Sequence, residues 1–142
     1  RTNLTDQRTN ANGDLSGPGE VWVVGPQVFS TVMDAIVKAV GREYQYIRMD
    51  QHLDDAADPS FYPRTDSAPY AERGIPFIDI MTGQHLDYHR QSDEVSTLDP
   101  AKMEGVARTI YLLAWHFADS PVTPRWDKPV PPSLWFVTPR KP

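Results

Sequence analysis

The sequence predicts an α/β fold, a three-layer α/β/α sandwich with a mixed sheet of which this chain supplies only part. Three short apolar segments typical of strands alternate with two longer segments in which apolar residues recur at helical spacing. Such alternation is typical of helices packed on both faces of a sheet. Three strands make a thin sheet for this architecture. We therefore expect about three strands and two long helices here, and further strands on residues absent from this sequence.

The chain opens with a loop and a buried strand. Residues 1–19 are rich in Asn, Thr, Gly and Asp and show no apolar periodicity, so we expect a loop there. Because the first residue is Arg and not Met, we also expect a truncation point. Residues 20–25 contain the run Val-Trp-Val-Val, which is typical of a strand buried on both faces, and Gly25-Pro26 closes it.

A helix and a second strand are expected next. Residues 27–40 carry apolar side chains on one helical stripe, and Gly41 is expected to end the helix. The stripe consists of Val28, Val32, Ala35, Ile36 and Ala39. Residues 44–49 alternate between apolar and polar side chains, which favours a strand.

The centre of the chain is predicted to be mostly loop. Residues 51–66 are polar and contain two prolines, whereas residues 67–73 favour a short helix followed by glycine. Residues 75–81 are the best candidate for the third strand, and a proline is tolerated near the beginning of a strand. Residues 82–98 return to loop.

The last third contains the clearest helix. Asp99 and Pro100 form a strong helix start, an N-cap carboxylate followed by proline at the first helical position. The buried face of this helix is expected to consist of Met103, Val106, Ala107, Ile110, Ala114 and Phe117. Seven of the fourteen prolines lie from residue 121 onward, so the tail is predicted to be extended. Three aromatic residues are expected to pack the tail against a surface: Trp126, Trp135 and Phe136.

Composition narrows the classes of function. The 142 residues include 39% hydrophobic and 23% charged residues, which is typical of a soluble globular protein. The net charge is −5 and no basic cluster stands out, so nucleic-acid binding is not predicted. No apolar run approaches the roughly 20 residues of a membrane span. Because cysteine is absent, any metal must be held by imidazole and carboxylate groups.

Two histidines after the third strand are the best candidates for a site. His85 and His89 are four residues apart, a spacing that on a helix places both rings on one face, as in zinc-binding helices. The context favours a loop, because the segment follows a strand directly, begins with glycine and has no Glu between the histidines. Open α/β sheets place their sites in loops at the carboxyl ends of strands. A functional role and a purely hydrogen-bonding role both stay open at this point.

Several ordered blocks of sequence resemble one family of zinc peptidases. Residues 61–76 read FYPRTDSAPYAERGIP, residues 82–89 read TGQHLDYH, and Asp93 follows. The blocks resemble, at matching spacing, the co-catalytic dizinc aminopeptidases, which include leucyl aminopeptidases, glutamate carboxypeptidase and, more distantly, glutaminyl cyclase. The resemblance runs from about residue 21 to about residue 118. It implies that residues 20–120 are the C-terminal half of a catalytic domain, with residues 1–19 as a loop and residues 121–142 as a tail.

The resemblance implies roles for five residues. His89 matches a zinc ligand, and Tyr88 matches a tyrosine whose hydroxyl stabilises the oxyanion in some members, although a packing role for Tyr88 stays open. Asp93 would orient His89 as a carboxylate partner of the metal-bound ring, or cap the loop. Asp66 and Tyr70 match positions that line the substrate cleft. Thr65-Asp66-Ser67 replaces the family's Ser-Asp-His, so any role of that histidine is lost.

The same resemblance implies an activity, a cofactor and partners. The intact family site holds two zinc ions, which activate water for hydrolysis of the N-terminal residue of a peptide substrate. Only one ligand, His89, has a counterpart here, so we expect this chain to be inactive without the missing N-terminal half of its domain. Secretion or a periplasmic location is implied by family relatives only. A non-catalytic receptor or interaction homologue and a glutaminyl cyclase remain alternative interpretations.

Overall fold

The sheet has three strands and is mixed. The computed structural model describes residues 15–56, 65–85 and 87–130. Among them, β1 (Glu20–Val24) lies between β2 (Arg48–Asp50), which is parallel to it, and β3 (Asp79–Met81), which is antiparallel. This arrangement confirms the predicted strands in number and order, and the mixed sheet. β2 and β3 are shorter than residues 44–49 and 75–81, which were predicted from side-chain alternation alone.

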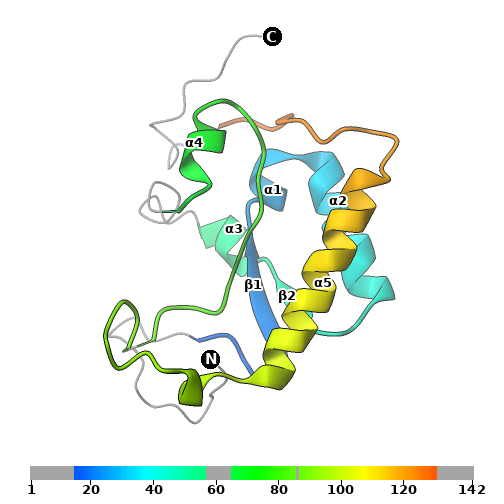
Figure 1. The fold of residues 1–142 in the computed structure, drawn as a ribbon. Coiled ribbons are helices and arrows are strands. Elements are labelled where there is room, and N and C mark those ends of the chain that lie inside the picture. The colour runs from blue at the N-terminus through cyan, green and yellow to red at the C-terminus, as the bar shows by residue number, and fades with distance from the viewer. Residues whose placement is uncertain (1–14, 57–64, 86, 131–142) are drawn as a thin grey trace.

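The central strand is covered on both faces, as its apolar run predicts. Val21 and Val23 pack with residues of α2 (Thr31–Glu43) and α5 (Pro100–Ala118). Val24 packs in a second cluster with Phe29, Ala71 and Phe77. In Figure 1, α2 and α5 lie on one side of β1, and α3 and α4 lie on the other side. The result is a small sheet between two layers of helices, as the sequence predicts.

The predicted helix over residues 27–40 is two helices. α1 (Pro26–Phe29) ends at Ser30, whose extended backbone interrupts the helix and whose hydroxyl oxygen accepts a hydrogen bond from the Met33 amide. Ser30 is therefore the N-cap of α2, a role for which serine is among the preferred residues. The apolar stripe read from the sequence crosses this break, so its register was wrong.

α2 also continues beyond the glycine that was expected to end it. Its buried residues are Met33, Val37 and Val40, and the helix passes through Gly41 to Glu43. A Cβ at Gly41 would lie 3.1 Å from the terminal methyl carbon of Met49. The glycine therefore provides close packing against β2 and does not terminate the helix.

Two short helices lie on the side of the sheet away from α5. α3 (His52–Ala56) occupies part of the predicted loop 51–66. It begins beside Asp50, whose Oδ1 accepts a hydrogen bond from the His52 amide at 2.9 Å. α4 (Ala68–Ala71) is a shorter version of the helix predicted over residues 67–73. The loop was predicted from polarity and prolines, which do not exclude a helix as short as α3.

The long helix α5 begins as predicted but buries a different face. Asp99 caps it by accepting from the amides of Ala101 and Lys102 at 2.9 and 3.1 Å. The buried residues are Lys102, Gly105, Thr109 and Leu113, whereas Met103 and Ile110 are about half exposed. A Cβ at Gly105 would lie 3.0 Å from the Tyr46 carbonyl oxygen. Close backbone approach at this glycine, which hydropathy does not reveal, sets the face that α5 presents to the core.

The beginning of the tail is extended and packed, in agreement with the prediction. The Trp126 and Phe29 rings have centroids 4.5 Å apart, and the Asp127 carboxylate accepts from the Thr31 amide at 2.9 Å. Trp135 and Phe136 lie outside the described residues. No helix in the described part of the chain has the length and hydropathy needed to cross a membrane.

Candidate functional site

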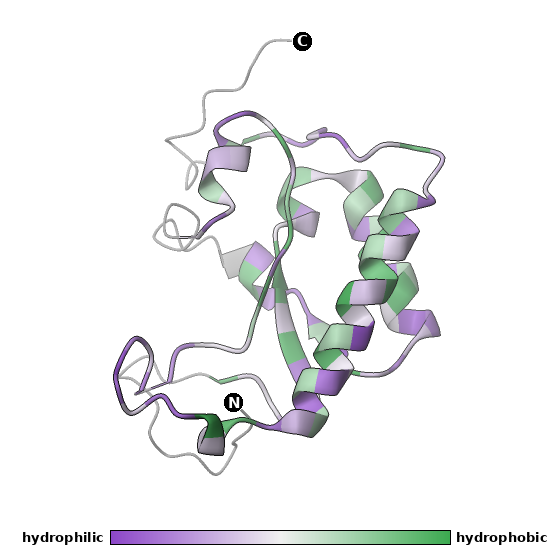
Figure 2. Ribbon diagram, viewed as in Figure 1, coloured by the Kyte–Doolittle hydropathy of each residue, from purple (hydrophilic) through white to green (hydrophobic). Residues whose placement is uncertain are grey.

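The candidate site is the loop after β3, residues 82–94, which we call the site loop. It starts at the carboxyl end of β3, as predicted. Because β3 is antiparallel to β1, this position is also the edge where β1 and β2 begin. The loop extends away from the sheet (Figure 1), and it is hydrophilic over most of its length (Figure 2). It is thus a polar projection at one edge of the sheet.

Hydrogen bonds within the site loop hold it in successive turns. The Tyr88 amide donates to the His85 carbonyl at 3.0 Å, and the Arg90 amide donates to the Asp87 carbonyl at 2.9 Å. The Asp87 side chain is buried and accepts from the Ser92 hydroxyl at 2.6 Å. The loop therefore has an internal polar core, and the sequence reading had assigned no role to Asp87.

His89 is presented to solvent by a left-handed backbone. Its φ is 59°, and it is the one residue other than glycine with positive φ among the described residues. Histidine is one of the few side chains enriched in this conformation, which nevertheless costs energy and occurs preferentially at functional sites. The exposed imidazole stacks on the Tyr88 ring, with centroids 4.0 Å apart and planes at 20°. Tyr88 is itself 44% exposed, so its ring is not a core residue.

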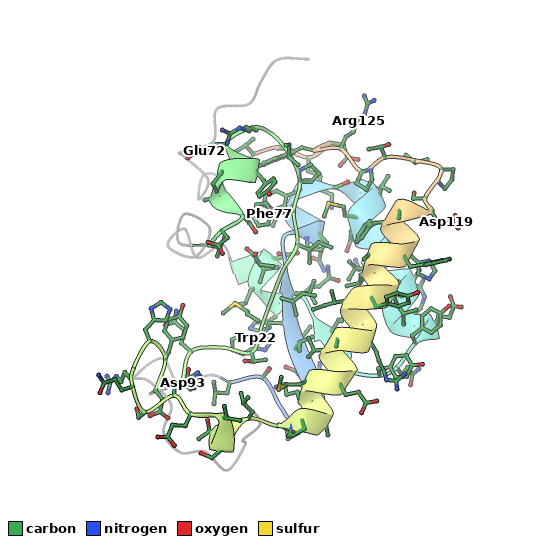
Figure 3. All side chains as sticks on the ribbon, in the orientation of Figure 1. Trp22, Glu72, Phe77, Asp93, Asp119 and Arg125 are labelled. Atoms are coloured by element: carbon green, nitrogen blue, oxygen red, sulfur yellow. The ribbon has the colours of Figure 1, made fainter. Side chains whose placement is uncertain are left out.

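His85 differs from His89 in its surroundings. Its side chain is only 11% exposed, and its Nε2 lies 3.7 Å from Oδ2 of Asp93. The Tyr88 ring meets it edge-on at 6.2 Å. Neither histidine lies on a helix, so their spacing of four does not place them on one helical face. Asp93, labelled in Figure 3, lies on the loop with its carboxylate near His85.

The predicted cleft residues lie elsewhere. Asp66 is exposed just before α4, and Tyr70 on α4 is 56% exposed. α4 and the site loop lie at opposite ends of the molecule, as the labels of Glu72 and Asp93 in Figure 3 also show. The structure brings together Tyr88, His89, His85 and Asp93, and it does not bring Asp66 and Tyr70 to them.

The described residues do not complete a metal site. No group of three or more His, Asp or Glu side chains in the described ranges could hold a metal ion. A protein zinc site takes about four ligands, and His89 offers one exposed imidazole. The residues at hand therefore do not fit a bound zinc ion by themselves, and no catalytic step through zinc follows from them.

One residue that contacts the surroundings of the site was missed. Lys102 of α5 is buried, and its ammonium group binds the segment that pairs with the start of the site loop. The sequence reading placed the neighbouring Met103 on the buried face because methionine is apolar. Lys102, Gly105, Thr109 and Leu113 recur at helical spacing, so the sequence does contain this buried face. A hydropathy pattern does not identify it, because lysine is scored as hydrophilic.

Comparison with known proteins gives one match. The model of peptidase family M28 matches residues 8–114, which are 107 of the 142 residues and include the site loop. Neither the curated proteins nor the solved structures contain a match to the chain.

Proposed function

The chain belongs to peptidase family M28, a family of zinc-dependent peptidases, and on that premise we propose that it contributes the His89 imidazole to the metal centre of an aminopeptidase. The observation that carries this proposal is the conformation of His89. A solvent-facing ring on a left-handed residue, at the carboxyl end of β3, is poised to bind a ligand. The turn that the Asp87 carbonyl and the Arg90 amide close holds this conformation and leaves the ring exposed.

The contacts of the site loop suggest how His89 is supported. Tyr88 stacks on the imidazole, which restricts the ring. Because Tyr88 is 44% exposed, its hydroxyl is proposed to stabilise an oxyanion. The Asp93 carboxylate lies near the His85 ring in the same loop. Asp93 is therefore proposed to restrain the loop through His85, in addition to orienting His89. A metal-binding histidine usually donates its second ring N–H to a carboxylate, and in the described residues the Asp93 carboxylate lies near His85.

The remaining ligands are proposed to lie on polypeptide outside the described residues. A family site with two zinc ions requires several carboxylates and a further histidine, and the described residues supply no cluster of this kind. When bound, the metal would polarise the scissile carbonyl and generate hydroxide at neutral pH. We propose that the chain alone is inactive. We also propose that the complete protein acts on peptide N-termini in a secreted or periplasmic location.

The proposal is tested by replacing His89 with asparagine in the polypeptide that includes the remaining ligands. Asparagine tolerates the left-handed backbone but lacks the imidazole, so the fold should be unchanged. Loss of a residue that only orients a ligand typically costs 10–100-fold, so loss of the ligand itself should lower kcat/KM by more than about 100-fold. His116→Asn, the same chemical change on α5 and outside the site loop, is the control.

Three outcomes distinguish the interpretations. Loss of activity and of zinc in His89→Asn, with free amino acid as the wild-type product, supports the aminopeptidase. Pyroglutamate as the product would identify a glutaminyl cyclase. A wild-type protein that binds no zinc and cleaves no aminoacyl-nitroanilide would identify a non-catalytic homologue and overturn the proposal. The roles of Asp66 and Tyr70 in a substrate cleft remain predictions, because α4 and the site loop lie at opposite ends of the molecule.

A further inference from the structure

The buried lysine of α5 contacts a segment that precedes the sheet. The Lys102 side chain is 5% exposed, although lysine is almost never fully buried without partners. Its ammonium group donates to the Ser16 hydroxyl at 2.8 Å, the Gly17 carbonyl at 2.9 Å and the Ser16 carbonyl at 3.2 Å. An ammonium group has three N–H donors, and these three oxygens can satisfy all of them.

The segment that Lys102 holds is paired with the start of the site loop. The Ser16 amide donates to the Thr82 carbonyl at 3.0 Å, and Leu15 forms an antiparallel bridge with Gly83. The Ser16 hydroxyl, which accepts from Lys102, also lies 3.4 Å from the Thr82 carbonyl. In Figure 1 this segment runs between the N-terminal end of α5 and the site loop. A continuous series of hydrogen bonds therefore joins α5 to Thr82.

Thr82 and Gly83 are the residues at which the site loop leaves β3. Gly83 has a φ of 91°, a conformation in which only glycine is comfortable, so the direction of the loop is set at this point. Beyond it the loop is held by its own turns, which fix His85, Tyr88 and His89 relative to one another. The bonds from Leu15 and Ser16 to Thr82 and Gly83 join the base of the loop to the segment that precedes β1.

We propose that Lys102 is a positioning residue that holds the base of the site loop, and with it His89, in place relative to the sheet. This inference rests on the proposed function in one respect, the role of His89 as a metal ligand. Packing alone does not require a lysine here, because its neighbours on the buried face include a glycine and a leucine. Burial lowers the pKa of Lys102, since it disfavours the charged form. An ammonium group is tolerated at such a position when hydrogen bonds compensate for its lost hydration.

The test compares four variants of the full chain by NMR and amide hydrogen exchange. Lys102→Met removes the donors and keeps an unbranched side chain of similar length, and Ser16→Ala removes one acceptor. Lys38→Met is the matched control, because Lys38 on α2 makes only an exposed ion pair with Asp34 in the described structure. His89→Asn identifies the His89 ring signals.

The expected result is local. In Lys102→Met, the Ser16 amide should exchange at least about tenfold faster, since hydrogen bonds to charged groups are among the stronger ones. The His89 ring signals, shifted by the stacked Tyr88 ring, should move as the loop relaxes. Amides of α2 and β1 should keep their protection. Ser16→Ala should show the same changes to a smaller extent, and Lys38→Met should show none of them.

Two results would overturn the proposal. One is unchanged Ser16 exchange and unchanged His89 signals in both Lys102→Met and Ser16→Ala. The other is faster exchange spread evenly over α2, β1 and the site loop, which would indicate general destabilisation. If Lys102→Met does not fold, Ser16→Ala carries the test, with the same two results deciding it. None of these measurements uses zinc or peptide hydrolysis, so a failure of the proposed function would leave this test unaffected.

Discussion

Replacement of Gly25 by alanine should be one of the most damaging single-methyl changes in the protein. Gly25 connects β1 to α1 with a φ of 114° and a ψ of −44°, outside the conformations that alanine adopts readily. A Cβ there would lie 2.5 Å from the Phe77 carbonyl oxygen and 2.9 Å from a ring carbon of Phe29. The Gly25 amide also donates to the buried Asp54 carboxylate at 2.5 Å, so the backbone cannot shift without loss of that bond.

The expected cost has two parts. A strained backbone conformation costs about 1–3 kcal/mol, and overpacking of a well-packed core typically costs about 1–3 kcal/mol. Their sum, about 2–6 kcal/mol, is a large fraction of the roughly 5–15 kcal/mol by which domains are stable. Because Phe77 leads into β3, a displaced Phe77 would also disturb the strand from which the site loop departs.

Substitutions at two other glycines separate the cost of backbone strain from the cost of overpacking. Gly74 has a φ of 70° but open space around its Cβ position, so Gly74→Ala should cost only the left-handed penalty of about 1–2 kcal/mol. Gly19 has neither a positive φ nor a close neighbour, so Gly19→Ala should be neutral or stabilising by up to about 1 kcal/mol. Urea unfolding followed by circular dichroism gives the three free energies. A Gly25→Ala protein as stable as Gly19→Ala would refute the reasoning.

Three further changes test the local physics of the fold. Asp99→Ala removes the carboxylate that caps α5 and should lower the free energy of unfolding by about 0.5–2 kcal/mol, whereas Asp99→Asn should retain most of the stability; equal urea midpoints for the alanine variant and the wild type would contradict the capping role. Gly105→Ala should destabilise the protein in spite of alanine's higher helix propensity, because its Cβ would press on the Tyr46 carbonyl at 3.0 Å; a raised melting temperature would show that the helix can move. Burial would raise the pKa of Asp50, but the backbone and side chain of His52 and the charge of Arg48 outweigh it and lower that pKa below 3.8. The folded-state pKa is thus below the unfolded one, so the carboxylate stabilises the fold above the unfolded pKa, and this stability is lost as the pH falls through the folded value. Asp50→Asn should therefore flatten the acid side of the stability profile, and an unchanged profile would exclude the effect.

The candidate site could be located from sequence but not assembled from it. The block that ends in Tyr88-His89 places an imidazole after the third strand, and the structure has it there. The left-handed φ of His89, the stacking of Tyr88 and the approach of His85 to Asp93 depend on how the turns close. Those contacts arise from backbone geometry and not from residue type, so no spacing rule could supply them.

The sequence by itself determined the order of the three strands and the two long helices. The apolar run of β1 and the Asp99-Pro100 start of α5 are local signals, since hydrophobic burial and N-capping act within a few residues. Only the tertiary structure decided which face of α5 is buried, that the helix predicted over residues 27–40 is interrupted at Ser30, and that Lys102 binds the segment around Ser16. The buried face of α5 and the contacts of Lys102 depend on close approaches between segments far apart in the chain. The break at Ser30 depends on a local cap that the hydropathy pattern does not contain.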